Sequence, residues 1–419
     1  MNDSKIYMDY NATTPLDPKV IDRILYTMSF NWHNPSSSYK AGMVAKSAIE
    51  DSRNHVANMI KAEPNEIIFT SGGTESNNMV LNSVVDDFYD RYAKIPMIIT
   101  STIEHDSISK VLLKMEVDGR IKLKQVEICS KTGAINIEKL ISSLNEDTAL
   151  VTVMLANNET GIIQPIRSIS KALQEYTDKH QFQNKILLHS DAGQALGKID
   201  ISVDDLGVDY LTIVGHKFYG PRIGALYVRN LHLNEKQIIC DSLIPIKSMF
   251  YGGGQERNFR SGTENTPMIV GLGKAAELVS INIDMYYFHM KKIRDYLETS
   301  LLRKFSMYGC KILSRFPESA SRLPNTCNVA LVTNFNITGP EILAKCRRLQ
   351  ASVGAACHSI DANKIHLYAG SEILKHCGYS LDLCRSAIRL SVGRETSKLD
   401  VDDAVEDLHN AVLQYLSMI

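Results

Sequence analysis

Between about residues 60 and 230, short apolar runs alternate with segments of helical periodicity. Val80, Val84 and Phe88, for example, recur every four residues and indicate an amphipathic helix. The alternation predicts a mainly parallel β-sheet that helices cover on both faces, with right-handed crossovers between strands. The strands expected from the apolar runs are 66–70, 97–101, 149–156, 186–190, 210–214 and 224–228.

The pattern changes after Gly262. A long helical stretch covers 266–304, more widely spaced strands are expected near 326–332 and 388–392, and an amphipathic helix covers 400–416. The 419 residues also exceed the roughly 250–300 at which a single hydrophobic core stops growing. We therefore predict a second, smaller domain after the sheet.

The composition is that of an ordinary globular protein, with 44% hydrophobic and 22% charged residues. The 46 basic and 47 acidic side chains nearly balance, so we expect neither nucleic acid nor a membrane surface as a partner. No apolar run approaches the roughly 20 residues of a spanning helix, and the start MNDSKIYMDY lacks the apolar region of a signal peptide. We expect a cytosolic protein.

Eight cysteines are too dilute for a disulfide scaffold, and none forms a C-x-x-C pair typical of zinc ribbons. We therefore expect reduced thiols. Cys129, Cys240, Cys310 and Cys327 sit in or beside apolar stretches, where a cysteine usually acts as a small buried hydrophobe.

A glycine-containing turn follows the first predicted strand, in the segment Phe69-Thr70-Ser71-Gly72-Gly73-Thr74-Glu75. A helix that begins there would offer unpaired N–H groups and the positive end of its dipole to an anion. Gly73 would let a phosphate approach, and Thr74 adds a hydroxyl. Such a turn can also be purely structural. It has neither the P-loop nor the G-x-G-x-x-G spacing, which argues against a nucleotide.

Two ionisable residues follow later predicted strands. Asp191 lies at the carboxyl end of an apolar strand, where doubly wound sheets place ligands. Lys217 follows the next strand, where desolvation favours an amine nucleophile. Alone, Asp191 could be a helix cap and Lys217 a surface lysine. With the glycine turn, they supply what pyridoxal phosphate needs: an anion site, a carboxylate for the pyridine nitrogen and a Schiff-base amine.

Over nearly its whole length the chain resembles class V, fold-type I pyridoxal-phosphate enzymes, in the branch of cysteine desulfurases and selenocysteine lyases. Several details favour the selenocysteine lyases: the residues before Gly215, the run YGGGQERNFRSGTENTP, and GAACHS from Gly354. Val214 stands where bacterial cysteine desulfurases usually carry a serine, which implies one hydroxyl fewer for the phosphate. The matching segments are YMDYNATTPL near the start, NPSS from Asn34, SGGTESNN from Ser71, EHDS from Glu104, NNETG from Asn157, SDAGQ from Ser190, GHKFYGP from Gly215, RSGTEN from Arg260 and RLSVGR from Arg389.

The resemblance implies a mainly parallel seven-stranded sheet covered by helices and a smaller α+β C-terminal domain. We expect the large cofactor-binding domain over 16–265, and the small domain over 1–15 plus 266–419.

The resemblance also implies roles for single residues. Lys217 would bond the cofactor and shuttle protons, Asp191 would pair with the pyridine nitrogen, and His105 would stack on the ring. Asn158 and Gln194 would contact the phenolic oxygen, and Gly73, Thr74 and His216 would bind the phosphate, with Thr263 reaching across from a second subunit.

The substrate side of the site follows from the same resemblance. Arg389 would bind the substrate carboxylate, a task for which a bidentate guanidinium suits better than lysine, with help from Asn11 and Asn34. Cys357 would receive the chalcogen, and its neighbour His358 could favour the nucleophilic thiolate. Taken as a lone cysteine, Cys357 would more often be structural. The irregular spacing of nearby cysteines and histidines argues against a metal cluster, so we expect none.

The function predicted is that of a homodimeric selenocysteine lyase, which decomposes L-selenocysteine to L-alanine and selenide with pyridoxal phosphate. Selenium would pass through Cys357 to a reduced acceptor, with selenophosphate synthetase as a candidate by analogy. A cysteine desulfurase acting on L-cysteine is the nearest alternative. An aminotransferase with the same cofactor and a catalytically inactive scaffold are the others, but a scaffold would need none of the residues named above.

Overall fold

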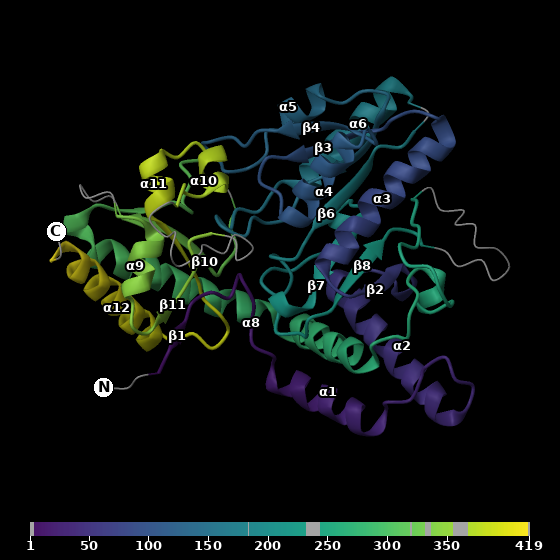
Figure 1. Cartoon of the computed structure of the whole chain (residues 1–419), viewed down its shortest axis with the longest axis horizontal. Coiled ribbons are helices and arrows are strands. Elements are labelled where there is room, and N and C mark those ends of the chain that lie inside the picture. The colour runs from purple at the N-terminus through teal and green to yellow at the C-terminus, as the bar shows by residue number, and fades with distance from the viewer. Residues whose placement is uncertain are drawn as a thin grey trace.

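The computed structural model describes residues 4–182, 184–231, 244–318, 321–331, 337–354 and 368–417. In these residues the chain forms a larger and a smaller region joined by one long helix (Figure 1). The predicted site residues Cys357 and His358, and also Cys240, lie outside the described residues.

The larger region is built on a seven-stranded sheet. Its strands are β2 (Ile67–Thr70), β3 (Met97–Ser101), β4 (Lys122–Val126), β5 (Thr148–Thr152), β6 (Leu187–Asp191), β7 (Tyr210–Val214) and β8 (Gly224–Val228). They lie in the order β2-β8-β7-β6-β5-β3-β4, and all neighbouring pairs are parallel except those that β8 makes with β7 and β2. This confirms the predicted α/β fold with a mainly parallel sheet.

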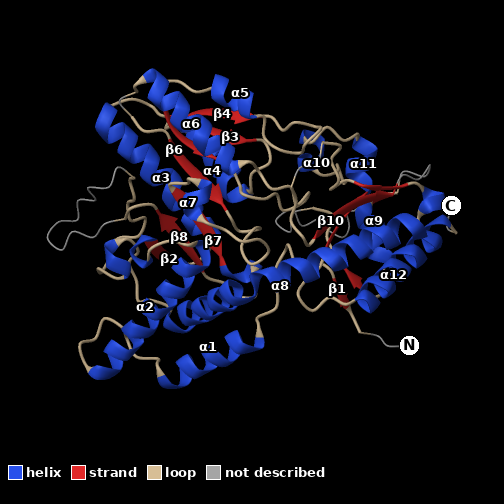
Figure 2. Cartoon of the chain, turned by 180° about the vertical axis from the view of Figure 1, so that it is seen from behind, coloured by secondary structure: helices blue, strands red, loops and turns tan. Residues whose placement is uncertain are grey.

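Helices cover both faces of this sheet, as Figure 2 shows from behind. Alternate strand residues face opposite ways: Ile98 packs with Val80 and Leu112, whereas Ile99 belongs to the core on the other face. The first face carries α3 (Gly73–Tyr92) and α4 (Asp106–Val117). The second carries α1 (Pro18–Phe30), α2 (Lys40–Ile60), α5 (Ile137–Ser142), α6 (Ile166–His180), α7 (Val203–Leu206) and the first half of α8 (Thr266–Lys304).

The smaller region contains two short sheets. Strands β9 (Cys310–Ile312), β10 (Thr326–Leu331) and β12 (Ala387–Ser391) form an antiparallel sheet in the order β12-β10-β9. Strand β1 (Ile6–Tyr7) pairs in parallel with β11 (Leu349–Gln350), so the start of the described chain joins this region. Its helices are α9 (Gly339–Lys345), α10 (Glu372–His376), α11 (Leu381–Ser386) and α12 (Lys398–Leu416).

Helix α8 connects the two regions. Leu272 near its start lies in the core beneath the large sheet, and Leu297 near its end lies in the core of the smaller region. The predicted helices over 266–304 and 400–416 match α8 and α12. The division into domains at residues 16 and 265 stays a prediction. In the described part of the chain, no helix is both long and apolar enough to cross a membrane.

Candidate active site

A cavity of about 400 Å³ lies at the carboxyl ends of β6 and β7, next to the start of α3. Residues from the N-terminal segment and from β12 complete its wall. Asn34 and Thr263 are exposed and do not line it, so their predicted roles stay predictions. The other described residues that the sequence singled out all line the cavity: Asn11, Gly73, Thr74, His105, Asn158, Asp191, Gln194, His216, Lys217 and Arg389.

The glycine turn forms one end of the cavity, where Gly73 is the first residue of α3. A Cβ atom on Gly73 would lie 2.6 Å from Val214 Cγ2, so no larger residue fits there without a shift. His216 lies across from it in the 3₁₀ helix η2 (Gly215–Lys217), with Nδ1 3.1 Å from Thr13 Oγ1. Burial, and then the charge of Lys217, lower the pKa of His216 to about 4. A helix N-terminus and a neutral imidazole are suited to bind a phosphate.

Asp191, the last residue of β6, is held from two sides. Its Oδ1 accepts a hydrogen bond from the Gly193 backbone N–H at 2.9 Å, and its Oδ2 accepts one from Asn77 Nδ2 at 2.9 Å. A Cβ atom on Gly193 would lie 3.0 Å from both Asp191 Oδ1 and Val214 Cγ2. The absence of a side chain there leaves this carboxylate accessible from the cavity.

Lys217 is positioned by the N-terminal segment. Its Nζ donates to the backbone carbonyls of Asn11 at 2.6 Å and Ala12 at 2.8 Å. These residues follow strand β1, which belongs to the smaller region, so the smaller region and the large sheet both contribute to the placement of this amine. A lysine held in a cavity with a carboxylate and an anion site meets the geometric needs of a Schiff-base amine.

A second lysine, Lys198, lies behind the cavity and was not singled out in the sequence. It is buried, and its Nζ donates to the backbone carbonyl of Gln194 at 2.9 Å and to Gln194 Oε1 at 3.1 Å. Gln194 Nε2 in turn donates to the backbone carbonyl of Asn11 at 3.0 Å. Burial, followed by the charges of Lys217 and Arg389, holds the pKa of Lys198 well below its ordinary value. Lys198 thus fixes which end of the Gln194 amide faces Asn11.

Arg389 enters the cavity from β12 and is only 1% exposed. Its Nη2 lies 2.7 Å from Asp9 Oδ1, and its Nη1 donates to the backbone carbonyl of Asn158 at 3.0 Å. Among the side chains that the structure describes, none accepts a hydrogen bond from Arg389 Nε. These bonds hold the guanidinium in place, and because each Nη atom carries two N–H groups, it retains donor capacity for an anionic ligand.

His105 is the N-cap of α4, and Ser107 follows two residues later. The backbone N–H of Ser107 donates to His105 Nδ1 at 3.1 Å, and the Ser107 hydroxyl lies 2.8 Å from the same atom. Because Nδ1 accepts a hydrogen bond, the proton of the neutral ring is on Nε2.

The preceding residue, Glu104, accepts from Ser101 Oγ at 2.5 Å and from the Met154 N–H. Burial outweighs these bonds and raises the pKa of Glu104 to about 8.

Replacing Glu104 with glutamine is expected to remove a pH dependence of stability. The folded state keeps the Glu104 proton up to a pKa of about 8, whereas the unfolded chain loses it near 4.5. The folded state therefore binds more protons between these values, and the free energy of unfolding falls as pH rises from about 4.5 to 8. At about 1.4 kcal/mol per tenfold change in proton affinity, the fall amounts to a few kcal/mol.

Urea unfolding at pH 6 and pH 8.5 measures this dependence. Glu104→Gln should lose much less stability between the two pH values than the wild type, while the exposed Glu138→Gln should behave as the wild type. Equal losses in Glu104→Gln and wild type would show that another group is responsible.

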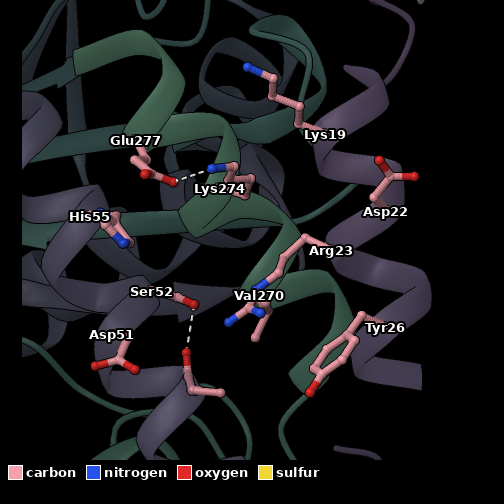
Figure 3. A pocket seen from close by; sticks show the side chains of 11 residues that line it. Lys19, Asp22, Arg23, Tyr26, Asp51, Ser52, His55, Val270, Lys274 and Glu277 are labelled. Atoms are coloured by element: carbon pink, nitrogen blue, oxygen red, sulfur yellow. Dashed lines mark hydrogen bonds and ion pairs between the residues drawn. The ribbon is translucent and has the colours of Figure 1, made fainter. Parts of the chain in front are cut away.

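A second cavity of about 520 Å³ lies between α1, α2 and α8 (Figure 3). Its wall mixes basic and acidic side chains, and Lys274 and Glu277 form an ion pair of 2.7 Å within it. None of the predicted site residues that the structure describes lines this second cavity. Among the described residues, no group of three or more His, Cys, Asp or Glu side chains is placed to hold a metal ion.

Comparisons with known proteins show what the chain is similar to. The family model of Aminotransferase class-V matches residues 6–403. A selenocysteine lyase from Xenopus tropicalis is 50% identical, with 97% of this chain and 93% of that protein covered. The cysteine desulfurase IscS of Methanosarcina thermophila is 36% identical, with 99% and 93% covered. A solved structure of a NifS-like protein superposes with a TM-score of 0.83 at 30% identity, covering 98% of this chain and 100% of that one. The chain belongs to the aminotransferase class-V family.

Proposed function

We propose that this protein is a pyridoxal-phosphate-dependent selenocysteine lyase, which converts L-selenocysteine to L-alanine and passes the selenium to a reduced acceptor. The observation that carries the proposal is one cavity at which an amine, a carboxylate and a guanidinium meet beside a helix N-terminus: Lys217, Asp191 and Arg389 with the start of α3. The 50% identity to a selenocysteine lyase over nearly the whole chain supports the choice of substrate.

The residues of the cavity fit pyridoxal phosphate. The cofactor needs an anion site, a carboxylate beside its pyridine nitrogen and an amine for covalent attachment. Gly73 and Gly193 keep side chains out of the space beside Val214, and the neutral His216 can donate to a phosphate without an added charge. We assign the phosphate to Gly73, Thr74 and His216, the pyridine nitrogen to Asp191, the ring face to His105, the phenolic oxygen to Asn158 and Gln194, and the covalent bond to Lys217.

The chemistry divides between the cofactor and the chain. When bound, pyridoxal phosphate withdraws electrons from the substrate's α-carbon, which allows the bond between the β-carbon and selenium to break. Lys217 would take the α-proton on Nζ and later return a proton to the alanine product. Asp191 would hold a proton on the ring nitrogen, and His105 would exclude water from one face of the ring.

Substrate binding and selenium transfer involve the remaining residues. Arg389 would bind the substrate carboxylate, assisted by Asn11, which lines the same cavity. Asn34 lies outside the cavity, so its part in substrate binding rests on the sequence resemblance alone. Cys357 would receive the selenium, with His358 favouring its thiolate, before a reduced acceptor such as selenophosphate synthetase removes it. These two residues lie outside the described residues, so their roles rest on the sequence resemblance. A cytosolic location is likewise a prediction of the sequence.

The alternatives differ in substrate and in their need for Cys357. A cysteine desulfurase would turn over L-cysteine as well as L-selenocysteine, and the 36% identity to such an enzyme supports this second candidate. An aminotransferase would not need Cys357, so full activity of Cys357→Ala toward a keto acid would favour it. A scaffold would release no product at all.

The test is the release of alanine and selenide from L-selenocysteine, compared with alanine and sulfide from L-cysteine at equal concentration. We expect at least about tenfold faster turnover of L-selenocysteine, a difference of about 1.4 kcal/mol in activation free energy. A selenol is more acidic than a thiol and leaves more readily, so L-selenocysteine should be the faster of the two substrates. Equal or faster turnover of L-cysteine would assign the protein as a desulfurase.

We also propose that the protein is a homodimer. Helix α1 exposes Ile21, Leu25 and Met28 along one side, and Phe30 and Trp32 at and just after its end are exposed as well. A second copy that covers it would remove this area from water. Thr263 is exposed and lies outside its own chain's cavity, in keeping with a role in the site of the partner subunit.

A further inference from the structure

Asn77 lies behind the cavity, in the second turn of α3, and is fully buried. Its side-chain amide makes three hydrogen bonds to other side chains. Nδ2 donates to Asp191 Oδ2 at 2.9 Å and to Ser107 Oγ at 2.8 Å, and Oδ1 accepts from Thr212 Oγ1 at 2.7 Å. A carboxylate oxygen can only accept, so the amide end that faces Asp191 is the NH₂ group.

This amide orientation determines the hydrogen bonds on the His105 side. Because the Ser107 hydroxyl accepts from Asn77, its own proton is available for His105 Nδ1 at 2.8 Å. The backbone N–H of Ser107 donates to the same nitrogen. Asn77 therefore helps keep Nδ1 as an acceptor and the ring proton on Nε2.

The orientation is set from the sheet side as well. Thr212 donates its hydroxyl proton to Asn77, so it accepts from His189 Nε2, which lies 3.1 Å away. His189 Nδ1 then accepts from Thr152 Oγ1 at 2.8 Å. Burial lowers the pKa of His189 to about 4, so the ring is neutral and has one donor and one acceptor, as this arrangement requires. Every donor in the row from Thr152 to His105 points the same way.

We infer that Asn77 is a positioning residue that holds the carboxylate of Asp191 and the imidazole of His105 in a fixed orientation relative to one another. This inference rests on the proposed function, in which Asp191 serves the ring nitrogen and His105 the ring face of the cofactor. Asn77 touches neither the reacting atoms nor the cavity, and it acts through Asp191 directly and through Ser107.

The test compares Asn77→Ala with Asn78→Ala in the full chain. Asn78 is the matched control, because its side chain donates only to the backbone carbonyl of Thr74 on a more exposed side of the helix. The first readout is the affinity of the cofactor-free chain for pyridoxal phosphate. The second is the pH at which the visible absorbance of the bound cofactor titrates, which a change in stability alone would not move.

We expect Asn77→Ala to weaken pyridoxal phosphate binding about 10- to 100-fold, the range for loss of a hydrogen bond to a charged group, and to move the absorbance titration by about one pH unit. Turnover number should fall while KM for L-selenocysteine changes less than about threefold, because Arg389 is untouched. Asn78→Ala should match the wild type. Wild-type affinity and titration in Asn77→Ala would overturn the inference.

Two further variants keep the inference falsifiable. If Asn77→Ala does not fold, Thr212→Val removes the donor that orients the amide and should move the same two readouts by smaller amounts. Ser107→Ala should weaken pyridoxal phosphate binding less in the Asn77→Ala background than in the wild type, since both substitutions interrupt one path. If the two substitutions changed the free energy of pyridoxal phosphate binding by strictly additive amounts, coupling through Ser107 would be excluded. Both readouts use pyridoxal phosphate without substrate, so failure of selenocysteine turnover would not be confused with failure of the inference.

Discussion

Lys217→Ala is expected to abolish the visible absorbance of covalently bound pyridoxal phosphate and to lower selenocysteine turnover by about 10²–10⁴-fold or more, the range for loss of a general acid–base group. Alanine removes the amine that would bond the cofactor, together with its hydrogen bonds to the Asn11 and Ala12 carbonyls. Absorbance spectra and alanine release measure the two losses.

A lysine outside the cavity provides the control. Lys247 lies on the surface, with its Nζ 2.6 Å from the exposed Asp90, so Lys247→Ala should retain colour and turnover. Circular dichroism and urea unfolding would show that Lys217→Ala is folded. A folded Lys217→Ala that keeps wild-type colour and turnover would place the covalent bond elsewhere.

The same variant tests the homodimer and the role of Thr263. In a mixed dimer of Lys217→Ala and Thr263→Val chains, one site combines Lys217 of one chain with the intact Thr263 of the other. If Thr263 serves the partner's site, the mixture should regain activity above that of either variant alone. No gain in a mixture that sedimentation shows to be dimeric would assign Thr263 no role across the boundary.

Arg389→Lys should lower kcat/KM for L-selenocysteine by about 10- to 150-fold, mainly through a higher KM. Losing a hydrogen bond between charged groups costs about 1.5–3 kcal/mol, and the ammonium of lysine cannot reproduce the planar set of donors. Lysine keeps a positive charge near Asp9, so this partly buried carboxylate is not left without a cation. Steady-state kinetics over a range of substrate concentrations separates KM from kcat.

Arg385→Lys is the matched control, because Arg385 is exposed on α11 in the same part of the chain. Its kinetics should equal those of the wild type. If Arg389→Lys lowered kcat alone and left KM unchanged, the substrate carboxylate would bind elsewhere and Arg389 would act on the geometry of the site.

The sequence predicted those parts of the fold that rest on continuous apolar runs. Strands such as β3 and β7 are buried along their whole length or nearly so, and their runs coincide with the predicted ranges. Edge strand β4 was missed because three of its five residues are polar and only Val126 is buried. An edge strand covered on fewer sides needs less apolar surface, so its sequence carries a weaker pattern.

Residues of the candidate site could be predicted where the residue type matches a known chemical need. Residues that only position another side chain through hydrogen bonds were harder to predict. Lys217 and Asp191 follow strands and have a chemistry that can be named, whereas Arg389 was indicated only by the family resemblance. Lys198 and Asn77 act through hydrogen bonds to residues far away in the chain: Lys198 to Asn11 across 187 positions, and Asn77 to Asp191 across 114. Asn77 stood in the quoted SGGTESNN motif, but nothing in its neighbours indicated what it binds.

The short segment from Asp9 to Ala12 has a consequence for how the site is assembled during synthesis. It contacts Lys217 across about half of the chain, and Asp9 contacts Arg389 across 380 positions. Contacts between such distant positions form slowly, because closing a long loop costs conformational entropy before any contact offsets it. On the ribosome, the amine and the arginine therefore cannot both be in place until β12 has emerged, although the large sheet is complete some 160 residues earlier. The enzyme matures only when its first residues meet nearly its last.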